Sequence, residues 1–122
     1  MSNAVNNVNI EDSARVLSRN AGGDRDHTYA VFSAANAALT GRPTLFFRVH
    51  KDSSAGSITL EVKLNNVVVF TSPFGADILR TVHEIVDNGV LQLANNTLTI
   101  TATAGTGTIE VSDVLLYYPT TV

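Results

Sequence analysis

The last third of the chain, residues 90–118, alternates apolar and polar residues with a period of two. The alternation is interrupted at Asn95-Asn96 and again at Gly105-Thr106-Gly107, and it resumes after each interruption. Successive side chains of a β-strand point to opposite faces, so this pattern is typical of paired antiparallel strands with one buried face. The stretch therefore favours an all-β fold.

Short strand-like segments, separated by turn residues, fill the rest of the chain. In residues 44–50 one parity is apolar and the other holds Phe46, Arg48 and His50. Residues 58–64 alternate most regularly and lead into Asn65-Asn66, which tolerates the positive φ of a two-residue hairpin. Further strands are expected at residues 5–10, 14–17, 28–34, 67–71, 80–86, 90–93, 96–103 and 108–118. This makes about eight to ten strands, and it predicts an antiparallel jelly-roll β-sandwich formed by one domain over residues 1–122.

Three places depart from simple alternation. Residues 34–39 favour a helix but are too few for a stable one, and residues 72–75 are expected to be a loop that leads into a helical turn at 76–79. The apolar parity also changes between residues 109–111 and 114–118. A β-bulge at Ser112-Asp113 would explain this change. The alternative is a strand of constant parity whose two faces are both largely buried.

Composition excludes several classes of protein. The 122 residues have a net charge of −3 and no basic cluster, which argues against binding to nucleic acid. Without cysteine there are no disulfides and no thiolate metal sites. No apolar run approaches the roughly 20 residues that span a membrane, and the N-terminus lacks the regions of a signal peptide. Residues 1–4 are interpreted as vector-derived or disordered.

Four segments between Thr44 and Tyr118 together resemble a known family. They are LEVKLNNVVVF, RTVHEIV, VLQLANNTLTIT and GTIEVSDVLLYY. This order of strands and turns is similar to the galactose-binding-domain-like β-sandwich of many carbohydrate-binding modules. The chain departs from the family pattern by having Asn66 and Asn95 where glycine is usual. The resemblance implies a non-catalytic, lectin-like carbohydrate-binding module, and it favours an extracellular setting.

Two segments supply candidate ligand-binding residues. The first is the loop of residues 72–75, whose Phe74 is expected to be exposed for stacking on a sugar ring or, alternatively, to pin the loop; Arg80 is placed in the same site. The second is the long polar loop of residues 18–26 with the histidine that follows it, where Asp24, Asp26 and His27 are candidates. The alternative for the histidine is an ordinary surface side chain.

A structural calcium ion is the cofactor that the resemblance implies. Related modules hold calcium between an N-terminal acidic residue and an aspartate of the last strand, and Glu11, Asp12 and Asp113 resemble those positions. Calcium takes six to eight oxygen ligands, so Asp24 and Asp26 form a second possible cluster. The alternative is that these carboxylates cap turns and solvate loops.

Neither of the remaining hypotheses involves a sugar. Catalysis is not expected, because His27, His50 and His83 are scattered and no serine lies in a nucleophile motif. An assembly role is the alternative to sugar binding: the alternating threonines of residues 97–103 predict a neutral face that could pair with a second copy or with another domain of a parent protein.

Overall fold

The computed structural model describes residues 4–19, 24–29, 32–52 and 56–121. Residues 1–4 were interpreted as vector-derived or disordered, and the first three of them lie outside these ranges. The described strands are β1 (Ala4–Glu11), β2 (Arg15–Arg19), β3 (Asp26–Thr28), β4 (Thr44–Lys51), β5 (Ile58–Leu64), β6 (Val67–Phe74), β7 (Ile78–Ile85), β8 (Leu98–Gly105) and β9 (Gly107–Thr120). No helix of membrane-spanning length and hydrophobicity occurs in these ranges.

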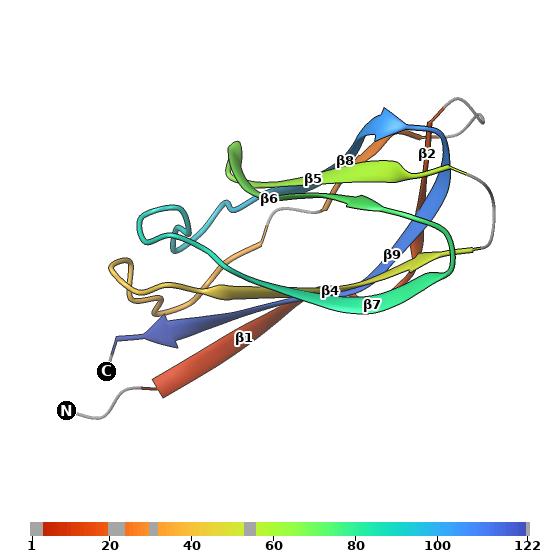
Figure 1. Ribbon diagram of the computed structural model, residues 1–122. Coiled ribbons are helices and arrows are strands. Elements are labelled where there is room, and N and C mark those ends of the chain that lie inside the picture. The colour runs from red at the N-terminus through yellow and green to blue at the C-terminus, as the bar shows by residue number, and fades with distance from the viewer. Residues whose placement is uncertain (1–3, 20–23, 30–31, 53–55, 122) are drawn as a thin grey trace.

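The strands form two antiparallel sheets that pack face to face (Figure 1). Sheet A has the order β1-β9-β4-β7, and β2 also pairs with β9; sheet B has the order β3-β8-β5-β6. The 14-residue β9 pairs with β1 through its second half and with β2 through its first half. The predicted all-β antiparallel sandwich is confirmed, and the described strand count falls within the expected eight to ten.

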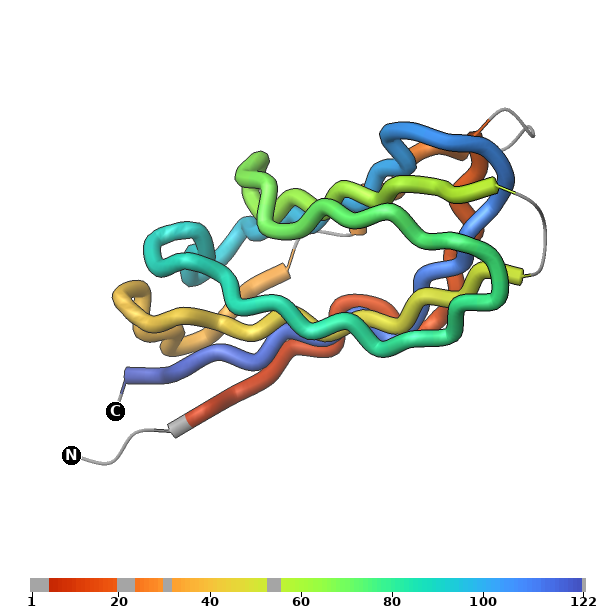
Figure 2. The backbone as a smooth tube through the Cα atoms, in the orientation of Figure 1, coloured from red at the N-terminus to blue at the C-terminus, as the bar shows by residue number. Residues whose placement is uncertain are grey.

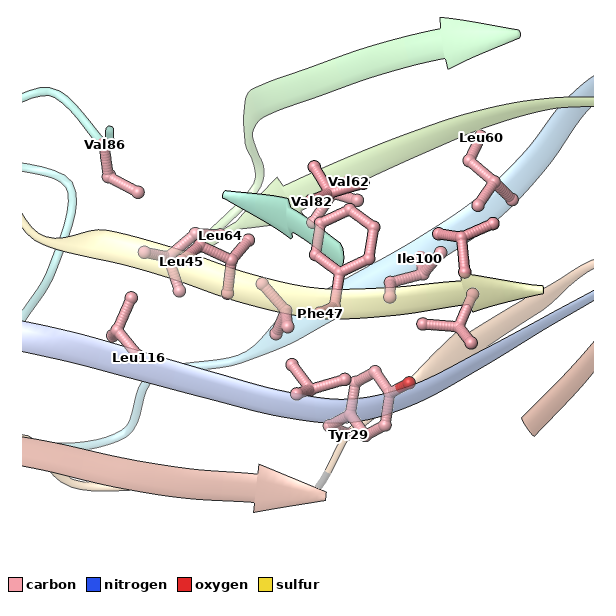
Figure 3. Packing of buried hydrophobic residues seen from close by; sticks show 14 of the residues in the cluster. Tyr29, Leu45, Phe47, Leu60, Val62, Leu64, Val82, Val86, Ile100 and Leu116 are labelled. Atoms are coloured by element: carbon pink, nitrogen blue, oxygen red, sulfur yellow. The ribbon is translucent and has the colours of Figure 1, made fainter. Parts of the chain in front are cut away.

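Side chains of one parity from each sheet meet between the layers and form the core (Figure 3). On β4 the inward residues are Leu45, Phe47 and Val49, and on β5 they are the four aliphatic residues of alternate positions, all buried. The ring of Phe47 meets that of Phe70 edge to face at 5.5 Å. Burial of these apolar surfaces is the main stabilising contribution to such a fold.

The expected β-bulge is present in β9. Phe46 of β4 faces Leu115, but Arg48 faces Ser112, so one extra residue is inserted on the β9 side. Asp113 adopts a left-handed backbone with φ of 52°. Ile109 and Val111 before the bulge, and the apolar residues of the other parity after it, are therefore all buried. The alternative of constant parity is wrong.

Asparagines occupy the tight turns as the sequence predicts. Asn65 and Asn66 have φ of 51° and 65°, which is the geometry of a two-residue hairpin with positive φ at both positions. Asn95, which stands where the family pattern has glycine, has φ of 60°. Asparagine tolerates this region better than other residues with a Cβ atom, so it can replace the glycine.

Several expected elements differ from the structure. Within the described part of residues 28–34 only Thr28 belongs to a strand, because β3 spans Asp26–Thr28. Residues 72–74 continue β6 instead of forming a loop, and β7 begins at Ile78 where a helical turn was expected. Residues 34–39 and 90–93 form turns without helix or strand. In each case hydrogen bonds to a distant segment override the local pattern.

The turns at one end of the sandwich gather beside the start of β1 and the end of β9 (Figure 2). Ala38 N donates to Pro119 O at 2.8 Å, and Gly89 N donates to Leu39 O at 3.1 Å. Ala4 pairs with Thr120 across β1 and β9, so the N- and C-terminal strands lie side by side. Hydrogen bonds between connections thus close this end of the core.

Candidate functional site

The predicted ligand residues of the β6–β7 region do not form an exposed site. Phe74 is 1% exposed and packs beside Phe70, so the expectation that its ring stacks on a sugar is wrong. The reason is that β6 continues through residue 74 and turns this side chain into the core. The exposed Arg80 places its guanidinium carbon 5.0 Å from the centre of the Phe74 ring and covers that edge of the sandwich.

The other predicted ligand residues lie at the opposite edge, where β2 and β3 meet. Asp24, Asp26 and His27 line a small hollow of about 190 Å³ together with Arg15. The ring of His27 contacts the buried ring of Tyr29 edge to face, with centroids 4.7 Å apart. The structure therefore brings these three predicted residues together but separates them from Phe74 and Arg80.

The carboxylates expected to bind calcium are directed to different partners. Glu11 accepts hydrogen bonds from Ser13 N at 3.1 Å and from Arg15 Nη2 at 3.2 Å, and these contacts hold the pKa of its carboxyl below the usual value. Asp12 accepts from the Asn9 side chain. Among the described residues no three acidic or histidine side chains are grouped as a metal site requires. As arranged, these carboxylates do not fit a calcium ion, and the calcium hypothesis stays a prediction.

The threonine face of β8 is not the uncharged surface that was expected. Thr99 lies opposite Lys63, and Thr101 lies opposite Glu61, on the neighbouring β5. These two charged side chains approach each other to 3.6 Å. The alternation of apolar and polar residues in β8 was predicted correctly. The neighbouring strand β5 adds charged side chains to that face, and the local sequence does not reveal which strand is the neighbour.

An apolar hollow lies on the outer face of sheet A. It has a volume of about 570 Å³ and lies over β4, β7 and β9. Phe46 and Tyr117 form its aromatic part, since their rings meet edge to face with centroids 5.3 Å apart. The ring of His83 lies 6.0 Å from that of Phe46 on the other side, and Leu115 completes the apolar lining.

Strand register explains why these residues meet. Cross-strand partners share a face of the sheet, so a residue of β4 and its partners on β7 and β9 form one row. Figure 1 shows the three strands side by side in the lower layer. Along β4 the rows are Ile85–Thr44–Tyr117, His83–Phe46–Leu115, Thr81–Arg48–Ser112 and Leu79–His50–Glu110.

Charged groups stand beside the aromatic rings in this hollow. Arg48 Nη1 lies 3.8 Å from Asp113 Oδ2, and the two side chains are 50% and 46% exposed. Asp113 has the parity of Leu115 and Tyr117 and so belongs to their face, and the bulge also brings Ser112 onto this face, opposite Arg48. Both groups keep hydrogen-bonding capacity for a ligand, since an ion pair at 3.8 Å leaves several donors and acceptors free for water.

Recognition on this face depends on side chains. β4 is hydrogen-bonded to β7 on one side and to β9 on the other, so its backbone groups are already used. A peptide cannot add here as a further strand, since that requires an exposed sheet edge. A ligand must instead lie on the rings and reach the polar side chains around them.

Apart from Asp113, which was expected to bind calcium, the residues that line this hollow were not among the predicted site residues. The signal was present, because Phe46 shares the parity of Arg48 and His50 and so had to point away from the core. Tyr117 follows the same logic once the bulge is accepted, and it is 39% exposed. What the sequence does not give is the register that places both rings side by side.

No protein-family model matches this chain, and no curated protein matches it in sequence. Solved structures do match its fold. Dimeric latent PorU from Porphyromonas gingivalis matches with a TM-score of 0.61 and 14% identity, over 93% of this chain and 13% of PorU. This chain therefore spans only a small part of that larger protein.

Two carbohydrate-binding modules match over nearly their whole length. The CBM36-1 domain of a multidomain xylanase from the hindgut metagenome of Trinervitermes trinervoides gives a TM-score of 0.53 and 11% identity, covering 99% of this chain and 100% of the domain. The xylan-binding module CBM15 gives 0.51 and 15%, covering 96% and 97%. The protein thus has a β-sandwich fold like that of carbohydrate-binding modules, as the sequence resemblance predicts.

Proposed function

We propose that this protein is a non-catalytic carbohydrate-binding module whose ligand lies on the outer face of sheet A. The observation that supports it best is the pair of adjoining rings, Phe46 and Tyr117, in an open hollow of about 570 Å³. Sugar-ring faces are apolar and their edges carry hydroxyl groups. A platform of aromatic rings with polar groups at its margin suits both properties.

The polar groups beside the rings match the hydroxyl groups of a sugar. Arg48 supplies hydrogen-bond donors and Asp113 supplies acceptors, and the two groups lie 3.8 Å apart. A hydroxyl group can accept from the first and donate to the second, so the pair can hold neighbouring hydroxyls of one ring. Thr44 and Thr81, which also line the hollow, add hydroxyl groups of their own.

Affinity electrophoresis in gels that contain soluble xylan, cellulose derivative, mannan or polygalacturonate tests this proposal. At least one polysaccharide should retard the protein, and Phe46→Ala and Tyr117→Ala should each lower the affinity about fivefold to thirtyfold, because a stacked ring contributes on the order of 1–2 kcal/mol. Val68→Ala is the matched control, since Val68 is 50% exposed on β6 of the other sheet. Failure of every polysaccharide to bind would overturn the proposal.

A role in protein assembly is the second candidate. It is favoured by Leu79 and Ile85, which are 67% and 62% exposed on the edge strand β7 beside the hollow. Exposed apolar groups at a sheet edge promote association with another chain or domain. Light scattering distinguishes the two roles: a stable oligomer that Leu79→Ser disperses would support assembly, and a monomer of 13.0 kDa would count against self-association.

A further inference from the structure

The hollow on sheet A is one of several that adjoin along the same strands. It shares Arg48 with a second hollow of about 240 Å³, which is lined by Leu79, His50, Glu110 and Ser112. This second hollow lies one row further along β4. It is not needed for the stacking site, and nothing in the proposed function accounts for it.

The same track continues beyond both of these hollows. At one end Thr44 and Tyr117 also line a hollow with Val5 and Arg42. At the other end His50 and Glu110 also line a hollow with Val16. From Thr44 to His50 the track follows six residue steps of β4, or roughly 20 Å.

Two basic side chains along this track each lie beside a carboxylate. Arg48 is paired with Asp113 at 3.8 Å, and one row further His50 Nδ1 lies 3.6 Å from Glu110 Oε2. Each of these two basic side chains therefore has a carboxylate beside it, and the middle of the track presents no excess of positive charge whether or not His50 carries a proton. An acidic ligand would meet Asp113 and Glu110 and would be repelled by them as much as it is attracted by the basic groups.

We infer that the ligand is the interior of a linear, uncharged polysaccharide chain that lies along β4, with one part on Phe46 and Tyr117 and the next part over the His50–Glu110 pair. The track is open at both ends, so it does not require a chain terminus. Its length exceeds that of one sugar ring several times over. The alternating ring and polar-pair surfaces fit a ligand that repeats the same apolar face and the same hydroxyl groups. This inference rests on the proposed function and specifies its ligand.

The inference is tested by titration calorimetry with linear oligosaccharides of xylan, cellulose and mannan, from monosaccharide to hexasaccharide, and with oligogalacturonates. For the neutral series that binds, affinity should rise about tenfold or more between the disaccharide and the hexasaccharide. Glu110→Gln and His50→Ala should lower hexasaccharide affinity and leave disaccharide affinity at the Phe46–Tyr117 site unaltered. Oligogalacturonates should bind more weakly than neutral chains of equal length.

The outcomes separate this inference from the proposed function. Binding of a disaccharide as tightly as the hexasaccharide would overturn the extended track while leaving the sugar site intact. Equal hexasaccharide affinity in wild type and Glu110→Gln, or tighter binding of oligogalacturonates, would also overturn it. Loss of the length dependence in Phe46→Ala, with unchanged thermal stability, would support it. If no saccharide binds at any length, the proposed function itself fails.

Discussion

Asn65 and Asn96 form a side-chain pair that joins three connections at one end of the sandwich. Asn65 Nδ2 donates to Asn96 Oδ1 at 2.8 Å and also to Val90 O at 2.8 Å. Asn96, which is fully buried, accepts from Gln92 N and donates to the carbonyl oxygens of Gln92 and Phe32. Every polar atom of its amide is thus satisfied within the protein, as a buried amide requires.

Asn96→Ala should therefore destabilise the protein strongly. The change removes four hydrogen bonds of a buried amide and leaves Gln92 N and O without these partners, whereas Phe32 O keeps its bond from the backbone N of residue 96, and the cost should be about 3 kcal/mol of unfolding free energy. Asn95→Gly is the matched control. Asn95 is exposed with φ of 60°, a conformation that glycine adopts readily, so the change should stay within about 1 kcal/mol. Urea denaturation measures both, and equal midpoints for the two variants would contradict this role of Asn96.

Gly105 is required by the close packing of β8 against β5. A Cβ atom there would lie 2.0 Å from Ser57 O, and the backbone has φ of 90°. Gly105→Ala should cost about 3 kcal/mol or more, because backbone atoms would have to move. Gly75→Ala is the contrasting change, since no atom lies within 4 Å of its added Cβ, and it should add about 0.5 kcal/mol of stability. Similar thermal midpoints for both variants would refute this reading of the β5–β8 contact.

Alkaline pH should destabilise the protein through Tyr29. Burial, and secondarily the charge of Glu11, raises the pKa of Tyr29 from 10.0 to about 12, and its hydroxyl has no hydrogen-bond partner within the described ranges. The unfolded chain loses this proton at lower pH than the folded one. Stability should therefore fall between pH 10 and 12, by about 1.4 kcal/mol per pH unit from this group.

Tyr29→Phe isolates the contribution of that hydroxyl. The variant keeps the ring in the core and removes an unsatisfied polar atom, so its stability at neutral pH should equal or exceed that of the wild type. The difference between the two proteins should grow as pH rises through this range. A constant difference from neutral to strongly alkaline pH, measured by urea denaturation, would show that Tyr29 does not titrate in this way.

Calcium is tested by thermal unfolding in excess calcium chloride and in chelator. Calcium binding at the predicted site requires Glu11 to release Arg15 and Asp113 to release Arg48. Because these contacts compete with the ion, we expect the two unfolding temperatures to agree. A higher unfolding temperature in calcium chloride than in chelator, together with loss of this difference in Asp113→Asn, would establish the ion site that the sequence resemblance implies.

Local sequence predicted the strands of the core well, because side-chain parity is a local property. The parity of residues 44–50, 58–64 and 109–118 gave the buried faces and the bulge at Asp113. It failed at Phe74, since Ser72-Pro73 resembles a loop by composition, whereas pairing of Thr59 with Pro73 extends the strand. Pairing with a distant partner is not visible in a window of ten residues.

The sequence by itself determined that this chain forms an antiparallel sandwich, with Phe46 and Tyr117 turned away from its core. Only the tertiary structure decided that β4 lies between β7 and β9, and hence that these rings adjoin each other and the Arg48–Asp113 pair. Strand order and register arise from contacts between residues far apart in sequence. The candidate site is made of those contacts, so alternation alone could supply its residues but not their arrangement.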